Sequence, residues 1–126
     1  MTYGSVESPD MPKVIGPYSQ AVRAGEFLFI SGQSGIDPAT GSVPAGGFEA
    51  EARQAFANLR TVVEAAGASL ERVVKTTVFL GSAEDFPAMN QLFAEFFASA
   101  PPARATPIVG LPRSLRISIE ATVFLG

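Results

Sequence analysis

The chain has 126 residues and a mass of 13.2 kDa, which is enough for one domain, and its apolar content of 47% supplies a hydrophobic core. It contains no Cys and no His, which excludes a thiolate nucleophile, a Ser-His-Asp triad and a zinc finger. A net charge of -3 and a pI near 4.9 do not provide the basic surface that phosphate-backbone binding requires. We therefore expect no nucleic-acid partner.

The N-terminal sequence MTYGSVESPD has no basic start, and no window of the chain approaches about 18 consecutive apolar residues. We therefore expect a cytoplasmic protein that neither spans nor binds a membrane. Pro9, Pro12 and Pro17 interrupt any regular period in residues 1–17, which predicts an irregular leader.

The middle of the chain predicts strands that alternate with helices. Residues 26–30 are a short apolar run that ends at Ser31, as expected of a buried strand. Residues 49–66 place apolar side chains at three- and four-residue steps before Gly67, which predicts a helix with a glycine at its C-terminal end. Residues 72–80 are rich in β-branched side chains and predict a second strand.

The second half of the chain predicts another helix and a final strand. Asp85 is the expected N-cap of a helix that ends before Pro101, and Asn90 shares one face of this helix with aromatic residues. Residues 115–123 alternate apolar and polar side chains, which is typical of a half-buried strand. Strands separated by two amphipathic helices predict an α+β fold with both helices packed on one face of a sheet.

Three side chains are candidates for a binding site, and each has a purely structural alternative. Arg104 either lies on the surface or clamps a carboxylate, because a guanidinium binds a carboxylate through two parallel hydrogen bonds. Asn90 either braces its helix or faces a cleft. Tyr18 follows a Gly-Pro turn and is either a packing residue or fixed beside a pocket.

Further candidates lie on the strands. Ser31 and Gly32 end the first apolar run, where Gly32 either lets a ligand approach the backbone amide or only allows a turn. Glu120 lies with Ser118 on the polar face of the last strand, where the alternative is a solvated or ion-paired carboxylate.

Six sequence blocks occur in the order and approximate spacing of a known protein family. They are IGPYSQAV at 15–22, ISGQ at 30–33, VKTTVFL at 74–80, DFPAMN at 85–90, PAR at 102–104 and LP at 111–112. On these blocks the chain resembles the RidA-type reactive intermediate (imine/enamine) deaminases from about Pro12 to the C-terminus. The resemblance implies a single RidA-like domain over residues 1–126, with a chorismate-mutase-like α+β fold in which two helices back a mostly antiparallel sheet. It also implies a homotrimer with a cleft at each subunit interface.

The family's reaction is the hydrolysis of small 2-imino acids, such as 2-iminobutanoate and 2-iminopropanoate, to 2-oxo acids and ammonia without a cofactor or a metal. The resemblance assigns the grip on the substrate carboxylate to Arg104. It places Tyr18, Ser31, the backbone of Gly32 and Asn90 in the cleft. Imines already hydrolyse in water, so such a site needs only to orient the substrate, polarise C=N and place one water. Tyr18 and Ser31 are the candidates to order that water or to donate a proton to nitrogen.

Two departures from the family pattern bear on this activity. Residues 117–121 read ISIEA where the family has IEIEA, so Ser118 replaces the glutamate that is thought to position the water, and Glu120 matches the second glutamate. These two positions share a face but lie about 6.5 to 7 Å apart by strand rise. Thr106, a further substrate-binding candidate, stands where the family often has Cys. Pro107 lies in a segment one residue short, which predicts a bulge or an altered loop.

Three functions remain open at this point. The first is deamination of small 2-imino acids, the second a related deaminase or hydrolase reaction on a different, pathway-specific acidic substrate, and the third non-catalytic binding of a small carboxylate. In every case the expected partner is a small carboxylate-bearing molecule. Neighbouring genes would separate the second function from the first, and ligand binding without turnover would indicate the third.

Overall fold

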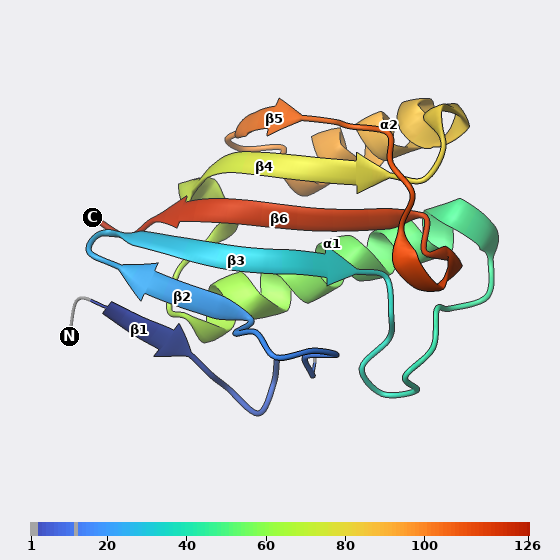
Figure 1. The fold of residues 1–126 in the computed structure, drawn as a ribbon. Coiled ribbons are helices and arrows are strands. Elements are labelled where there is room, and N and C mark those ends of the chain that lie inside the picture. The colour runs from blue at the N-terminus through green and yellow to red at the C-terminus, as the bar shows by residue number, and fades with distance from the viewer. Residues whose placement is uncertain (1–2, 12) are drawn as a thin grey trace.

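Six strands form one sheet in the order β1-β2-β3-β6-β4-β5 in the computed structural model, which describes residues 3–11 and 13–126 (Figure 1). The strands are β1 (Tyr3–Val6), β2 (Ala21–Ala24), β3 (Phe27–Ser34), β4 (Val73–Leu80), β5 (Ala103–Ala105) and β6 (Ile117–Phe124). Neighbouring strands are antiparallel except β4 and β5, which run parallel. The mostly antiparallel sheet that the family resemblance implies is confirmed.

The two helices α1 (Gly47–Ala65) and α2 (Phe86–Phe96) lie on the same face of this sheet (Figure 1). A cluster of phenylalanine rings joins them. The centroids of Phe56 in α1 and Phe96 in α2 are 4.9 Å apart, and those of Phe93 and Phe97 are 4.7 Å apart. The core therefore lies between the helix layer and the sheet, and the predicted α+β class with helices on one face is confirmed.

Helix α1 forms where its apolar residues recur at three- and four-residue steps. This spacing buries Ala52, Ala55, Leu59 and Val62 along one stripe against the sheet. The helix is followed by Gly67, whose φ of +81° is the left-handed conformation that a glycine adopts without steric cost. The N–H of Gly67 donates to the carbonyl of Glu64 at 2.9 Å, so the predicted glycine at the end of this helix is confirmed.

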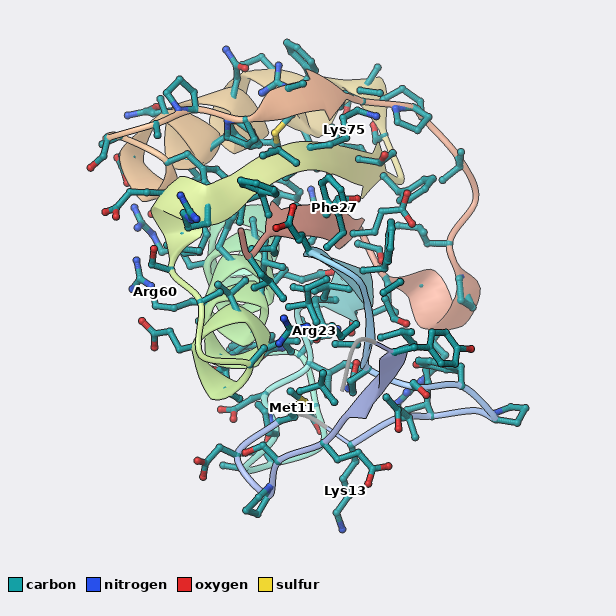
Figure 2. All side chains as sticks on the ribbon, turned by 90° about the vertical axis from the view of Figure 1, so that its left-hand side faces the viewer. Met11, Lys13, Arg23, Phe27, Arg60 and Lys75 are labelled. Carbon is teal, nitrogen blue, oxygen red and sulfur yellow. The ribbon has the colours of Figure 1, made fainter. Side chains whose placement is uncertain are left out.

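The other face of the sheet is not covered by a helix within the described residues (Figure 1). Strand β6 shows the division, because Ile117 and Ile119 are buried under the helices whereas Ser118 and Glu120 point to the uncovered face. Figure 2 shows the sheet from its end, with Arg60 on the helix side and Lys75 on the opposite side. Phe27 and Phe29 of β3 are 41% and 47% exposed in this single chain.

Several local expectations are corrected by the structure. The leader contains strand β1, which pairs with β2 and so gains order from a partner that lies far along the chain. Strand β3 does not end at Ser31 but continues through a bulge to Ser34. Asn90 is exposed rather than on the buried aromatic face of α2, whose buried residues are Met89, Leu92 and Phe93. Pro12, where the family resemblance begins, lies outside the described residues.

The N-terminal end of α2 differs from its expected cap. The side chain of Asp85 makes no capping hydrogen bond with the helix. It accepts two hydrogen bonds from the guanidinium of Arg116, at 2.8 Å to Nη2 and 3.3 Å to Nε. The side chain of Ser82 accepts from the N–H of Glu84 instead, in the short turn before α2. Asp85 therefore connects α2 to the start of β6.

Neither α1 nor α2 combines the length and the apolar character that crossing a bilayer would require, and the same holds for every helix in the described part of the chain.

Candidate active site

A pocket of about 470 Å³ opens at the end of the sheet where β3 finishes and β6 begins. Its walls come from the segment before β2, the end of β3, the loop that follows β3, helix α1 and the loop before β6. The lining residues are Lys13, Ile15, Tyr18, Gln20, Gly32, Gln33, Ser34, Ile36, Pro38, Gly41, Asn58, Leu111, Pro112, Arg113, Leu115 and Ser118. A pocket of this size, mostly apolar with a few polar groups, is typical of a small-molecule site.

A β-bulge brings Gly32 and Ser118 together at this pocket. The pairing of β3 with β6 is Ile30 with Ala121 and then Gln33 with Ile119, so β3 carries one more residue than β6 in this interval. The bulge turns Gly32 to the uncovered face and buries Gln33. A Cβ atom at Gly32 would lie 2.6 Å from Oγ of Ser118, so only glycine fits here without displacement. In the single chain it is the hydroxyl of Ser118 that lies close to Gly32, and the approach of a ligand to this backbone stays a prediction.

Ser31 connects the bulge to the segment that carries Tyr18. Its backbone N–H donates to the carbonyl of Gln20 at 2.9 Å, and its hydroxyl donates to the carbonyl of Ser19 at 2.6 Å. These bonds fix the segment next to β3, and Tyr18 lines the pocket. Ser31 itself is not among the lining residues. Its hydroxyl is bonded within the chain and holds the segment from which the tyrosine projects.

Two buried amides form the floor of the pocket, and the sequence reasoning did not select them as site residues. Asn58 donates from Nδ2 to the carbonyls of Ser34 and Ile36, at 2.9 and 2.8 Å, and so holds the chain that leaves β3. Gln33 donates from Nε2 to Oε1 of Gln20 at 2.8 Å and to the carbonyl of Ser31 at 3.0 Å. The available signal was Asn58 itself, a polar residue on the apolar stripe of α1.

Arg104 lies in a different region of the fold from this pocket. It is on β5, where it pairs with the buried Thr76 of β4 and is directed toward α2. Its guanidinium carbon lies 4.8 Å from the ring centroid of Phe93 and 5.5 Å from that of Phe86, and Nη1 is 3.9 Å from Sδ of Met89. Ser118 faces the opposite side of the sheet. One chain therefore does not bring Arg104 and the Gly32–Ser118 pair together.

The remaining candidates divide between these two regions. Thr106 is half-buried just after β5, two positions after Arg104. Asn90 is exposed on α2, next in sequence to Met89, which Arg104 contacts. Glu120 is exposed and pairs with Thr77 of β4 in the sheet. It lines a shallow depression of about 210 Å³ on the uncovered face, which also includes Lys75 and Phe29. Glu120 therefore does not line the pocket of its own chain, whereas Ser118 does.

Beyond β5 the chain contacts the edge of the sheet through an isolated bridge between Ile108 and Leu80, next to Pro107. Strand β5 ends at Ala105, and the carbonyl of Pro107 then accepts a hydrogen bond from the N–H of Leu80 at 3.0 Å. The N–H of Val109 donates to the carbonyl of Leu80 at 2.9 Å. The chain therefore stays hydrogen-bonded to the end of β4 on its way to the loop at the pocket. This fits a proline at the edge of a sheet.

The loop before β6 supplies Arg113 to the pocket, which the sequence reasoning also did not select. Its short turn η3 (Pro112–Ser114) contains Arg113 at φ 59° and Ser114 at φ 56°, a left-handed conformation in two consecutive non-glycine residues. The loop is anchored where it ends, because the buried carboxylate of Glu51 accepts the N–H of Arg116 at 2.6 Å.

Comparisons with known proteins agree with this architecture. The profile of the family described as Endoribonuclease L-PSP matches residues 8–125. A RutC family protein of Pyrococcus horikoshii is 47% identical over 114 residues, which cover 90% of each chain. A 2-iminobutanoate/2-iminopropanoate deaminase of Dermatophagoides farinae is 43% identical over 121 residues, covering 95% of this chain and 94% of the relative. The crystal structure of RidA from the Antarctic bacterium Psychrobacter sp. PAMC 21119 has a TM-score of 0.90 at 38% identity and covers 96% of this chain and 98% of that chain. The chain therefore belongs to the RidA-type imine deaminase family, whose profile carries the description Endoribonuclease L-PSP.

Proposed function

We propose that this protein hydrolyses small 2-imino acids, of the 2-iminobutanoate and 2-iminopropanoate type, to 2-oxo acids and ammonia. The relative of 43% identity that is named for this activity, matched along 95% of this chain, is the observation that carries the proposal. The pocket beside Gly32 and Ser118 supports it, because it offers a small-molecule site that includes Tyr18 and Gly32, two of the residues that the family resemblance places in the cleft.

The reaction requires little chemistry from the protein. Water adds to the carbon of C=N, a proton passes to the imine nitrogen, and the resulting carbinolamine expels ammonia and leaves the 2-oxo acid. Tyr18 and Ser118 line the pocket and are the side chains proposed to orient this water. The backbone at Gly32 allows the substrate to come close, and Ser31 acts by holding the segment of Tyr18.

Arg104 is proposed to anchor the substrate carboxylate, with Asn90 and Thr106 beside it. A half-buried guanidinium gains from a charged partner, yet no ion pair of Arg104 occurs within residues 3–11 and 13–126. The rings of Phe86 and Phe93 hold it in place without neutralising it. Such an arginine is available to a carboxylate, which it binds through two parallel hydrogen bonds.

We further propose that the protein is a homotrimer in which the pocket of one copy meets Arg104 of a neighbouring copy. Two observations support this assembly: Arg104 lies away from its own pocket, and Phe27 and Phe29 are exposed on a sheet face without a covering helix. Large apolar side chains on an uncovered face favour an interface. Glu120, which also lies on this face, would then be close to the contact between copies.

The name of the family profile refers to RNA cleavage, but the chain favours a small acidic substrate. Its net charge is -3, and it has no histidine for acid-base catalysis at a phosphodiester. The proposal also retains the cytoplasmic location that the sequence predicts.

The test is the rate of 2-oxo acid formation from 2-iminobutanoate, generated in place by a threonine dehydratase, with residual imine trapped by semicarbazide. We expect the wild type to accelerate hydrolysis and Arg104→Ala to abolish the acceleration with an unchanged circular dichroism spectrum. Arg23→Ala, an exposed arginine on β2, is the matched control and retains the activity. Retained activity in Arg104→Ala would refute the anchor, and a wild type without acceleration would favour a different acidic substrate or a binding role.

The shared site has its own test. Arg104→Ala and Tyr18→Ala chains are each inactive in this proposal, and unfolding and refolding them together forms mixed trimers. If each site combines two copies, about a quarter of the sites in an equal mixture are complete and activity returns. Mixtures that stay inactive would show that each chain carries its own site.

A further inference from the structure

The pocket is larger than small 2-imino acids require. Its volume is about 470 Å³, within the range of roughly 300–1,000 Å³ that is typical of sites for drug-sized ligands. The apolar side chains of Ile36, Leu111 and Leu115 are among the lining residues. In the single chain the pocket therefore has room for a substrate side chain longer than an ethyl group.

The buried amides of the pocket do not provide hydrogen-bond donors for the end of such a side chain. Both N–H bonds of the Asn58 amide are directed at backbone carbonyls, those of Ser34 and Ile36. The Nε2 group of Gln33 donates to Gln20 and to the carbonyl of Ser31. These donors hold the pocket wall together, so a polar ligand group has to find its donors elsewhere in the lining.

The charged residues that line the pocket in the described chain are both basic. Lys13 and Arg113 both line the pocket, and neither Asp nor Glu is among its lining residues in the described chain. Neither cation forms an ion pair within those same residues. The side chain of Lys13 extends into solvent (Figure 2), so it acts on a ligand mainly through its long-range field, and the direct contact falls to Arg113.

Arg113 is held at this position against a conformational cost. The left-handed conformation is unfavourable for a non-glycine residue, and Arg113 and Ser114 both adopt it. The loop that holds them is fixed at its end through Arg116, whose N–H donates to Glu51 and whose guanidinium pairs with Asp85. Two buried carboxylates therefore anchor the chain next to a strained turn whose arginine lines the pocket.

We propose that the pocket selects 2-imino acids whose side chain ends in a second anionic group, and that Arg113 is the residue that recognises this group. This assignment rests on the deaminase function proposed above and specifies its substrate class. Arg104 would hold the carboxylate next to the imine, and the apolar wall would contact the connecting carbons. Arg113 would bind the distal carboxylate through its planar guanidinium.

The test compares two imines of similar length that differ at the distal end. L-Glutamate oxidase generates 2-iminoglutarate in place, and L-amino-acid oxidase generates 2-iminopentanoate from norvaline. We expect a higher kcat/KM for 2-iminoglutarate in the wild type. Arg113→Gln lowers this ratio of kcat/KM values by about tenfold, the lower end of what a hydrogen bond to a charged group contributes. Lys13→Gln lowers it less, and its effect decreases with added salt.

Arg23→Gln is the control, because it removes the same charge from β2 at a residue that does not line the pocket. It leaves the ratio unchanged. A wild type that prefers 2-iminopentanoate, or an Arg113→Gln variant that loses the same factor with both imines, would overturn the assignment. The second result would mean that Arg113 binds the carboxylate that both substrates share.

A binding measurement separates this assignment from the deaminase function on which it rests. Calorimetry with the products 2-oxoglutarate and 2-oxopentanoate measures the same preference without turnover. Tighter binding of 2-oxoglutarate that Arg113→Gln removes, together with no hydrolysis of any imine, would refute the deaminase and retain the subsite. Hydrolysis of both imines with equal binding of both products would retain the deaminase and refute the subsite.

Discussion

Gly32 on β3 faces Ser118 on β6 so closely that a Cβ atom on Gly32 would lie 2.6 Å from Oγ of Ser118. The two residues belong to segments more than eighty positions apart, and the bulge in β3 is what turns Gly32 toward the pocket. The close approach makes the backbone at Gly32 part of the pocket surface. We therefore expect even the methyl group of an alanine at position 32 to disturb the pocket.

We expect Gly32→Ala to lower kcat/KM for imine hydrolysis by at least about tenfold, because the added methyl displaces Ser118 or occupies the substrate's place. Steady-state kinetics with 2-iminobutanoate measure the effect. Gly110→Ala is the control, since no heavy atom lies within 4 Å of a Cβ added there, and it retains activity. Equal activities in the two variants would argue against a substrate that binds next to Gly32.

Ser118 lines the pocket, and none of the lining residues in the described part of the chain carries a carboxylate. A carboxylate at this position can accept a proton from the attacking water, and general-base catalysis contributes roughly 100- to 10,000-fold in enzymes. We expect Ser118→Glu to raise kcat for imine hydrolysis by about tenfold or more, within the lower part of that range. Ser118→Gln matches the size without the charge and shows no rise. Equal rates in both variants would indicate that another group handles the water.

Asn58 carries the two hydrogen bonds that hold Ser34 and Ile36 at the floor of the pocket. Asn58→Ala leaves both carbonyls without this donor, and we expect a loss of about 2–3 kcal/mol in the free energy of unfolding. Urea denaturation measures it. Glu64→Ala, at an exposed position of the same helix, changes stability by less than about 0.5 kcal/mol. A loss below about 1 kcal/mol in Asn58→Ala would mean that water replaces the amide.

Glu51 and Glu49 provide a matched pair of carboxylates on α1. Glu51 is buried and accepts the N–H of Arg116, whereas Glu49 is exposed and pairs with Arg53 at 3.0 Å. We expect Glu51→Ala to cost about 2–3 kcal/mol and Glu49→Ala no more than about 0.5 kcal/mol. Glu51→Ala also lowers the rate of imine hydrolysis, because the pocket loop that contains Arg113 loses its anchor. Glu51→Gln restores part of the stability and part of the activity. Similar losses of stability in the two alanine variants would contradict this difference.

Phe29 is proposed to lie in the interface between copies of the chain. We expect Phe29→Glu to convert the proposed trimer to monomers, because an interface does not tolerate an unpaired charge in place of an apolar side chain. Light scattering coupled to size-exclusion chromatography measures the mass. Tyr3→Glu, which changes a more exposed aromatic residue on β1, keeps the trimer. Loss of the trimer should also abolish imine hydrolysis. A trimeric and active Phe29→Glu protein would place the interface elsewhere.

The sequence alone determined the elements whose pattern is local. The apolar steps of residues 49–66, the β-branched run of 72–80 and the alternation of 115–123 predict α1, β4 and β6 because each periodicity reflects burial on one side of the element. The local sequence patterns did not predict strand β1 or the bulge in β3. Strand β1 forms by pairing with β2, and the bulge forms where β3 pairs with β6. The proline-rich leader contains no local signal for the pairing of β1.

The candidate residues of the site show the same division. Their identity and the family followed from six short blocks in order along the sequence. Only the tertiary structure decided that Tyr18, Gly32 and Ser118 share a pocket while Arg104 faces α2 on the other side of the sheet. Which residues meet depends on strand register and on the face to which each side chain points. A shift of one residue, such as the bulge at Gly32, reverses that face, and spacing along the chain does not reveal it.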